Sequence, residues 1–141
     1  MNIRYFRQKD REPLSQLFLQ TRKTSWLWID SSKWQLSDFE KYTQHEIILV
    51  AVNGQQYLGF ASIYLDDNFL HHLFVAPDVQ KKGVGSALLA SAEQLFTGTG
   101  YLKCLLENKQ ALNFYQRHDW TVSGTGNSEE GAYLLMSKEK L

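Results

Sequence analysis

A short glycine-containing segment, Gln80 to Ser86, stands between an apolar stretch and a helical pattern. The apolar stretch predicts a strand that ends at Leu73-Phe74-Val75, before Pro77. A strand that turns into a helix start presents free backbone N–H groups at the positive end of the helix dipole, and this arrangement binds phosphate. Gly83 and Gly85 carry no Cβ atom, so a ligand can approach the backbone closely there. The segment therefore predicts a phosphate-binding loop.

Two lysines beside these glycines, Lys81 and Lys82, could add positive charge at the edge of the loop. A solvated pair of lysines is the simpler interpretation, and only the neighbouring glycines favour the phosphate role over it. The residue order excludes a Walker loop, because Lys82 precedes Gly83. It also excludes a dinucleotide-binding fingerprint, because Leu88 stands where a third small residue is required.

Two motifs resemble those of the GCN5-related N-acetyltransferase (GNAT) family. The first resembles the family's pyrophosphate loop and follows Val75-x-Pro77 with the spacing Gln80-x-x-Gly83-x-Gly85. The second resembles the family's later motif and reads Asn108-x-x-Ala111-x-x-Phe114-Tyr115. The resemblance extends over about Ile47 to Trp120 and departs from the family pattern at Asp119, where Gly is usual. Asp tolerates a left-handed turn better than most residues, so a turn is still expected there.

The resemblance implies that acetyl-CoA is the co-substrate. Backbone amides of Gln80 to Ser86 would hold the pyrophosphate, and the pantetheine arm would lie where the strand ending at Val75 splays from the next strand. The residues implied in cofactor binding are Leu73, Phe74, Val75, Gln80, Lys81, Lys82, Gly83, Val84, Gly85, Ser86, Asn108, Ala111 and Phe114. A metal site is not expected, because neither His-Glu-x-x-His nor Cys-x-x-Cys occurs in the chain.

Acetylation of an amine requires a proton acceptor for the amine and a proton donor for the departing thiolate. Tyr115 matches the family's general acid by position, and its simpler interpretation is a core aromatic residue. His71 is the favoured base, because an imidazole titrates near neutrality and some amine acetyltransferases of the family have His at this position. His72 and water are the alternatives for the base, and a structural role for His71 is equally open. Strand alternation predicts that His71 shares a face with Leu73, opposite to His72.

The family binds its acceptor mainly with the N-terminal third of the chain, where Trp26 and Trp28 stand in a segment without clear periodicity. We expect these two residues to contact the acceptor, which would be a primary amine of a small molecule or of a protein. Packing of the aromatic side chains onto the sheet is the simpler interpretation, since Trp is largely buried on average. The sequence does not identify the acceptor.

Length and composition predict one domain, residues 1–141, with 43% hydrophobic residues. The formal net charge is zero, from 15 basic and 15 acidic residues, so a nucleic-acid partner is not expected. No apolar run is long enough to span a membrane, and the first residues do not resemble a signal peptide. The single cysteine, Cys104, excludes an internal disulfide and fits a cytoplasmic location. Its apolar surroundings predict a buried thiol rather than a nucleophile.

The expected fold is an α/β domain of the GNAT type, with a mixed, mostly antiparallel twisted sheet of about seven strands and flanking helices in the order βααβββαβαββ. The predicted strands are Ile3 to Phe6, Ile47 to Val52, Tyr57 to Leu65, Phe69 to Val75, Tyr101 to Leu106, Trp120 to Val122 and Ala132 to Ser137. The predicted helices run from a cap at Asp10 to about Arg22, from about Leu36 to Gln44, from Val84 to Phe96 and from Asn108 to Arg117. Gly124 to Asn127 are predicted as a turn.

An acetyl-CoA-dependent N-acetyltransferase that acts by direct transfer is the leading hypothesis. The alternative is a CoA-binding regulatory or interaction module without catalysis, against which the hydroxyl of Tyr115 argues. The final strand, Ala132 to Ser137, is expected at an exposed sheet edge, where a second subunit could pair to form a homodimer.

Overall fold

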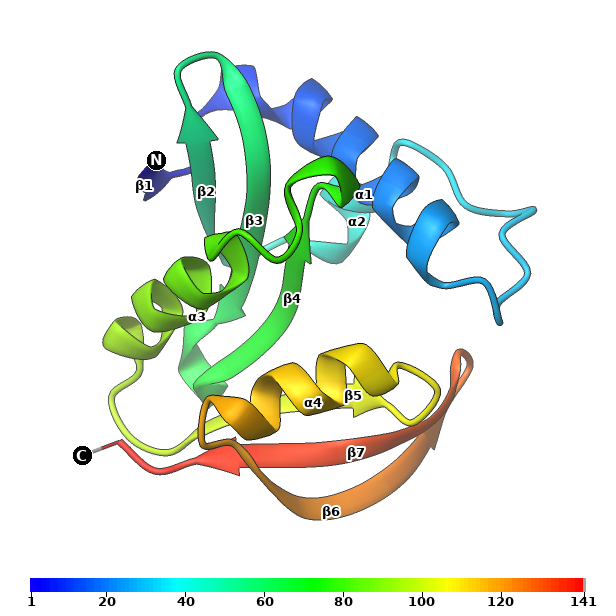
Figure 1. Cartoon of the computed structure of the whole chain (residues 1–141), viewed down its shortest axis with the longest axis vertical. Coiled ribbons are helices and arrows are strands. Elements are labelled where there is room, and N and C mark those ends of the chain that lie inside the picture. Colours follow the sequence, from blue (N-terminus) through cyan, green and yellow to red (C-terminus); the bar gives the residue numbers. More distant parts are fainter. Residues whose placement is uncertain (141) are drawn as a thin grey trace.

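The computed structural model describes residues 1–140 and has the element order that the sequence predicts. One seven-stranded sheet has the strand order β1-β2-β3-β4-β5-β7-β6 (Figure 1). The strands are β1 (Asn2–Tyr5), β2 (Ile47–Asn53), β3 (Gln56–Tyr64), β4 (Phe69–Val75), β5 (Gly100–Leu105), β6 (Thr121–Ser128) and β7 (Gly131–Lys138). The helices are α1 (Arg11–Ser25), α2 (Asp38–Tyr42), α3 (Val84–Leu95) and α4 (Lys109–Arg117). The mixed, mostly antiparallel sheet with flanking helices is therefore confirmed.

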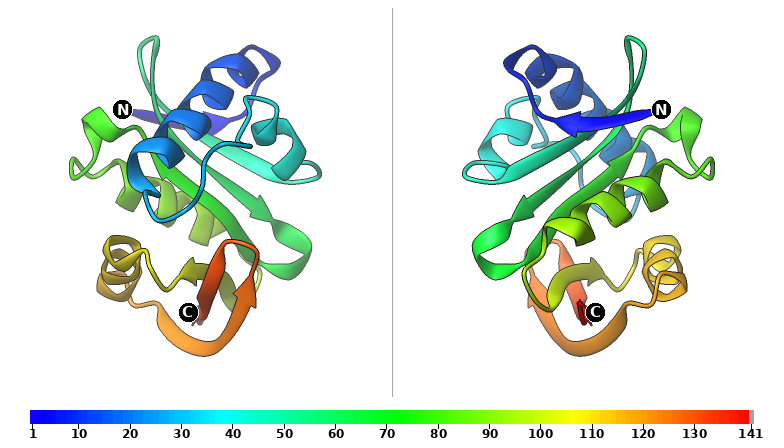
Figure 2. Two further views of the ribbon diagram at one scale, coloured as in Figure 1. Left: turned by 90° about the vertical axis from the view of Figure 1, so that its right-hand side faces the viewer. Right: turned by 90° about the vertical axis from the view of Figure 1, so that its left-hand side faces the viewer.

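Helices cover both faces of the sheet, and each face has its own hydrophobic core (Figure 2). In α1, Leu14, Leu17 and Phe18 form an apolar stripe that packs with Phe39 of α2 against β2, β3 and β4. On the other face, Leu88 and Leu89 of α3 are almost completely buried, in one core with Tyr115 of α4. No helix within residues 1–140 is long and apolar enough to cross a membrane.

Within residues 1–140, β4 and β5 are the only parallel neighbours in the sheet, and only two residue pairs join them. Their register consists of two residue pairs, Phe69 with Tyr101 and Leu70 with Leu102. Among the described residues, the rest of β4, from His71 to Val75, has no β5 partner. In Figure 1 the sheet accordingly divides into an upper part, β1 to β4, and a lower part, β5 to β7. Backbone groups along this open edge of β4 therefore have no partner in β5.

A β-bulge in β4 changes the direction of one histidine. Ser62 of β3 pairs with His72 and Ile63 pairs with Leu70, so His71 is an extra residue in the ladder. The two imidazole rings lie with their centroids 3.8 Å apart, which places both on one side of the strand. His72 packs edge-on against Phe18 of α1. The predicted alternation of His71 and His72 is therefore wrong, because the bulge adds a residue at the point where alternation was counted.

The predicted turn at Gly124 to Asn127 is wrong, because these residues belong to β6. The hairpin between β6 and β7 turns at Glu129 and Glu130 instead. Gly126 lies opposite Tyr133 of β7, and a Cβ atom at Gly126 would stand 2.4 Å from the tyrosine ring. Glycine is thus required here for the close approach of an aromatic ring across the strands, and not for a turn.

The last strand of the chain is not at the edge of the sheet. β7 lies between β5 and β6, so the expected exposed edge at Ala132 to Ser137 is wrong. The edge strands are β1 and β6. Homodimer formation stays a prediction without a defined strand pairing.

Asp10 stands before α1, but its carboxylate makes no capping bond to that helix. The side chain is completely buried and accepts two hydrogen bonds from the guanidinium of Arg4, at 2.8 and 2.9 Å. It also accepts bonds from the hydroxyl of Tyr57, at 2.6 Å, and from the backbone N–H of Arg7, at 2.8 Å. The predicted cap is replaced by a junction of β1, β3 and the start of α1. Arg4 is the main cause that lowers the pKa of Asp10 far below its ordinary value.

We expect Asp10→Asn to lower the free energy of unfolding by about 3 kcal/mol, because the partly buried guanidinium of Arg4 loses the fully buried carboxylate that is its counter-charge. The lowered pKa means that the carboxylate stabilises the fold fully above about pH 5 and loses this effect as the pH falls below about 4. Urea unfolding at pH 7 and at pH 3 measures both effects, and the difference from the wild type should shrink at pH 3. Equal stability of the two proteins at pH 7 would contradict this role.

Candidate active site

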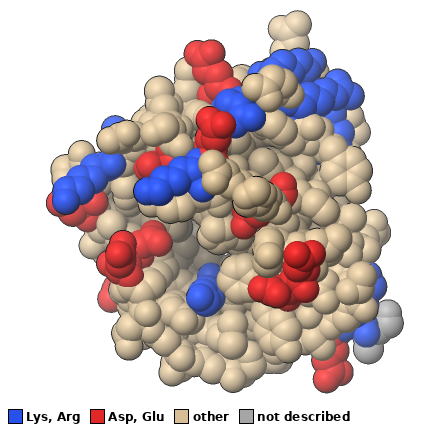
Figure 3. Space-filling model, turned by 180° about the vertical axis from the view of Figure 1, so that it is seen from behind, with Lys and Arg blue, Asp and Glu red and all other residues tan. Residues whose placement is uncertain are grey.

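A cavity of about 980 Å³ occupies the gap that the divergence of β4 and β5 creates. Its lining comes from α1, β4, the loop before α3, β5, α4 and the β6–β7 hairpin. The predicted site residues that line it are Trp26, His71, Leu73, Phe74, Val75, Gln80, Lys81, Gly83, Gly85, Ser86, Asn108, Ala111, Phe114 and Tyr115. Lys82, Val84 and Trp28 are not part of the lining. The back of the molecule is hollowed left of centre, with side chains of both charges around the hollow (Figure 3).

The loop between β4 and α3 has the geometry of an anion-binding helix start. Lys81 and Gly83 both have positive φ, at 66° and 87°, which turns the chain into α3 at Val84. The first N–H groups of a helix have no partner within it, and here those of Val84, Gly85 and Ser86 are in that position. The side chain of Val84 is buried in the core, so only its backbone can serve a ligand.

The side chain of Gln80 holds this loop against the strand that precedes it. Its Nε2 atom donates a hydrogen bond of 3.1 Å to the carbonyl oxygen of Val75. The side chains of Lys81 and Lys82 are exposed, so they can supply charge without fixing the path of the backbone. Gln80 therefore positions the loop. The hydrogen-bond donors of the loop are its backbone N–H groups.

Helix α4 forms the opposite wall of the cavity. The Asn108 side chain caps this helix, since its Oδ1 atom accepts a bond of 3.2 Å from the N–H of Ala111. The ring of Phe114 lies against the loop, at 3.4 Å from the position that a Cβ atom of Gly85 would take. The hydroxyl of Ser86 bonds Nε2 of His118 at 2.9 Å, and Nδ1 of the same ring donates to the Phe114 carbonyl at 2.8 Å. These contacts join the two walls at the loop.

Tyr115 reaches the cavity from a buried position on α4. Burial, with a smaller effect from Cys104, raises the pKa of its hydroxyl above the ordinary value. A proton on this oxygen is therefore retained at neutral pH and is available to a negatively charged group in the cavity. The protonated hydroxyl can donate a hydrogen bond there.

Cys104 is 4% exposed and lies on β5 beside the cavity. Burial raises the pKa of its thiol to about 11. The reactive form of cysteine is the thiolate, which this environment disfavours. The prediction of a buried thiol is confirmed, and the site chemistry must use other groups.

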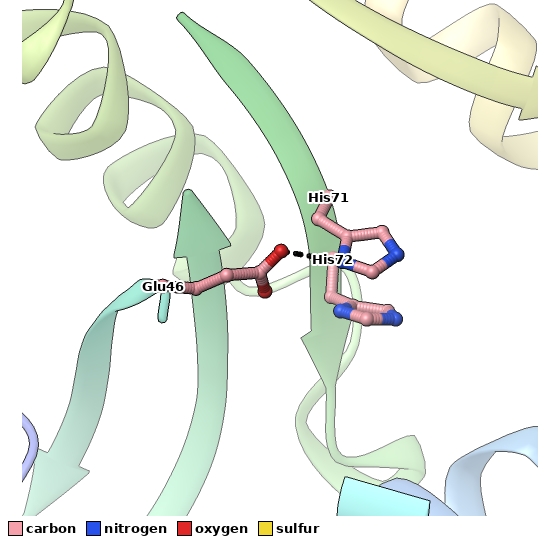
Figure 4. Close-up of side chains that lie close together, drawn as sticks. All are labelled: Glu46, His71 and His72. Carbon is pink, nitrogen blue, oxygen red and sulfur yellow. Dashed lines mark hydrogen bonds and ion pairs between the residues drawn. The ribbon is translucent and has the colours of Figure 1, made fainter. Parts of the chain in front are cut away.

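His71 pairs with a carboxylate that comes from another part of the chain. Nδ1 of His71 lies 2.6 Å from Oε2 of Glu46, in the segment before β2 (Figure 4). A carboxylate partner fixes the proton on Nδ1, so that Nε2 becomes a proton acceptor. The Glu46 side chain is 8% exposed, whereas that of His71 is 38% exposed. The acceptor nitrogen, Nε2, therefore belongs to His71, which is the more exposed residue of the pair.

Comparison with known proteins identifies the family of this protein. Residues 12–120 match the sequence model of the Acetyltransferase (GNAT) family. The chain belongs to this family. It is accordingly an acyltransferase of the N-acetyltransferase type.

Two curated relatives and one solved structure illustrate the similarity. The chain is 27% identical over 134 residues to the uncharacterized N-acetyltransferase YhfO of Bacillus subtilis, covering 85% of this chain and 89% of YhfO. It is 35% identical over 65 residues to the peptidyl-lysine N-acetyltransferase YiaC of Escherichia coli, covering 46% of this chain and 43% of YiaC. The fold is similar to that of the PaiA N-acetyltransferase of Thermoplasma acidophilum in complex with coenzyme A, with a TM-score of 0.81, 21% identity and coverage of 99% and 100%.

The far end of the cavity in this GNAT protein has a wall that sequence patterns did not indicate. Lys103 lies 4.9 Å from the ring centroid of Tyr133, and both line the cavity together with Glu130 of the β6–β7 turn. Burial raises the pKa of Glu130, while the charges of Arg22 and His71 act against this shift. These residues lie on elements whose pairing only the folded sheet defines. Thr21 also lines the cavity. Its position one helical turn after Phe18 in α1 is the sequence pattern that could have indicated this.

The two tryptophans predicted at the acceptor end have different positions in this GNAT protein. Trp26 lines the cavity, and its ring packs on Phe74 at 5.6 Å between centroids. Trp28 lies outside the lining and contacts Trp26, at 6.1 Å between centroids. Trp26 can therefore touch a molecule in the cavity, while Trp28 supports Trp26.

Proposed function

We propose that the protein transfers the acetyl group of acetyl-CoA directly to a primary amine, with both substrates bound together. One observation carries this proposal: a single cavity is lined by the loop glycines Gly83 and Gly85, by Tyr115, and by His71, which pairs with Glu46. The solved PaiA structure, of the same fold, contains coenzyme A, which supports the choice of donor. The buried, disfavoured thiolate of Cys104 supports direct transfer over a covalent acetyl-enzyme.

The donor would lie along the gap between β4 and β5. Its pyrophosphate would accept hydrogen bonds from the free N–H groups at the start of α3. Its pantetheine arm carries amides, which can pair with the open backbone edge of β4 between His71 and Val75. Ala111 and Phe114 of α4 would close the other side of the arm. The thioester would then stand near Tyr115, at the middle of the cavity.

The amine would enter between Trp26 and the β6–β7 hairpin and attack the thioester carbonyl. A carbon–nitrogen bond forms, the carbon–sulfur bond breaks, and the nitrogen loses one proton. Nε2 of His71 would accept this proton, while Glu46 holds Nδ1–H and balances the positive charge on the ring. Tyr115 would donate a hydrogen bond or its proton to the departing sulfur, and its raised pKa favours the hydrogen bond.

The lining favours an acceptor that combines a cationic group with an apolar neighbour. Glu130 supplies negative charge and Trp26 supplies an aromatic face, both of which suit an ammonium group. A lysine side chain of a protein and a small amine share this chemistry. The similarity to the peptidyl-lysine acetyltransferase YiaC supports including lysine peptides among the acceptors tested.

The decisive experiment follows thiol release from acetyl-CoA with a panel of small amines, polyamines and lysine peptides. Calorimetry of acetyl-CoA binding is carried out in parallel, with ATP and NAD as controls. Amine-dependent thiol release supports the acetyltransferase. Acetyl-CoA binding without release with any amine would favour a CoA-binding module, and no binding would refute the cofactor site.

We expect Gly85→Val to weaken acetyl-CoA binding at least tenfold. A side chain at this position would press on Phe114 and Val75 and occupy the approach to the loop amides. Calorimetry gives the affinity, and circular dichroism checks the fold. Gly98→Ala is the matched control, because a Cβ atom there meets nothing closer than 3.7 Å and Gly98 does not line the cavity. Unchanged affinity in Gly85→Val would remove the loop from the binding site.

We expect Tyr115→Phe to lower kcat by about 10 to 100-fold and to change the acetyl-CoA affinity by less than about threefold, because only the donor to the departing sulfur is lost. Tyr101→Phe is the control, since Tyr101 lies on β5 outside the cavity lining. Single-turnover kinetics separate the chemical step from product release. A single-turnover rate equal to that of the wild type would exclude Tyr115 from the mechanism.

A further inference from the structure

Three side chains with metal-binding atoms meet beside the bulge of β4. Glu46, His71 and His72 each offer one such atom, and these three atoms lie within 4.8 Å of one another. Figure 4 shows the Glu46 side chain reaching from the segment before β2 toward His71, with the two imidazole rings side by side on β4. The bulge creates this arrangement, because regular alternation would place the rings on opposite faces.

Glu46 has an oxygen atom without a partner. Its Oε2 atom pairs with His71, but Oε1 is buried and has no hydrogen-bond partner within residues 1–140. The side chain as a whole is only 8% exposed. Burial of a carboxylate oxygen without a donor or cation costs free energy. An ion at this position would satisfy the oxygen.

The histidines are suited to act as ligands. Nδ1 of His72 bonds the hydroxyl of Ser62 at 2.9 Å, and a hydrogen bond on one ring nitrogen is the usual support for a ring that binds metal through the other. The ring of His72 also packs edge-on against Phe18, at 5.2 Å between ring centroids, and this contact holds the ring in place.

We propose that Glu46, His71 and His72 form a binding site for a divalent transition-metal ion of the Zn²⁺ type. Two imidazoles with one carboxylate are a common ligand set for Zn²⁺, whereas Mg²⁺ and Ca²⁺ prefer oxygen ligands. Tetrahedral Zn²⁺ with bonds of 2.0–2.2 Å separates its ligand atoms by about 3.3 Å, so the side chains need to approach by about 1.5 Å at most. His71 and His72 line the cavity, so the fourth position would face its interior.

The charges around the cluster are compatible with a cation. Glu130 lies close enough for its charge and that of His71 to influence each other, and it adds negative charge on the cavity side. Arg22 acts in the opposite direction, but its guanidinium is bound to Asp38 at 3.1 Å and stacks on Phe18 at 3.9 Å. The positive charge of Arg22 is thus already compensated by a carboxylate.

The ion would inhibit the proposed reaction. A nitrogen lone pair that binds a metal ion cannot accept the proton of the amine, and the open metal position would compete for the amine itself. This consequence rests on the proposed role of His71, whereas the binding site does not. Zn²⁺ would therefore regulate or poison acetyl transfer from within the acceptor end of the cavity.

The test is calorimetric titration of untagged, EDTA-treated and desalted protein with Zn²⁺, together with the visible absorption spectrum of the Co²⁺ complex. We expect one Zn²⁺ per chain and the intense d–d bands of four-coordinate Co²⁺. Glu46→Gln and His71→Gln should each weaken Zn²⁺ binding at least tenfold. His45→Asn is the matched control, because His45 is an exposed histidine outside the cluster and its positive φ suits Asn. Absence of Zn²⁺ binding, or wild-type affinity in both cluster variants, would overturn the site.

A second readout separates this proposal from the proposed function. In an active preparation, Zn²⁺ should reduce amine-dependent thiol release, in competition with the amine, and EDTA should restore the rate. The thiol released in this assay also binds Zn²⁺, so acetylated product is measured by mass spectrometry. Zn²⁺ binding that depends on the cluster in a protein without transferase activity would support the metal site and refute the acetyltransferase. Activity without Zn²⁺ binding would do the reverse.

Discussion

The separation of β4 from β5 after two residue pairs is the constraint on which the site depends. In a sheet, the backbone N–H and C=O groups of neighbouring strands normally form hydrogen bonds with each other. Here β4 and β5, in the middle of the sheet, form few such bonds. Helices α3 and α4 stand on either side of the opening (Figure 1). The loop before α3, Tyr115 and the open edge of β4 all line one cavity. The hydrogen bonds between β4 and β5 are thus absent where the proposed ligand would bind.

The bulge at His71 is the second departure from regular structure, and it lies next to the first. One extra residue directs two successive histidines to the same side, where a carboxylate 25 positions away in the chain meets them. The same geometry serves two kinds of chemistry. A carboxylate that orients an imidazole favours proton transfer, and a carboxylate beside two imidazoles favours a metal ion. The two proposed uses would exclude each other at His71, and the cluster would then be a point of control.

The sequence predicted those parts of the fold that depend on local patterns. The bounds of β4, the helix start after the glycine loop and the left-handed Asp119 follow from neighbouring residues, and the structure confirms them. The errors in strand pairing and side-chain direction arose where a distant strand decides the outcome. The bulge needs the β3 register, Gly126 needs Tyr133 across the hairpin, and β7 is internal because β6 folds back outside it. Glu46 could not be paired with His71 for the same reason.

The narrow junction between β4 and β5 also bears on how firmly the two parts of the sheet hold together. A molecule bound in the gap would contact both parts of the sheet. Its contacts would take the place of the hydrogen bonds that β4 and β5 do not make with each other. Occupancy of the cavity is therefore coupled to the rigidity of the whole domain, because binding to the folded state alone shifts local opening as well as global unfolding. In a cell, resistance of this protein to proteolysis would then follow the supply of its ligand.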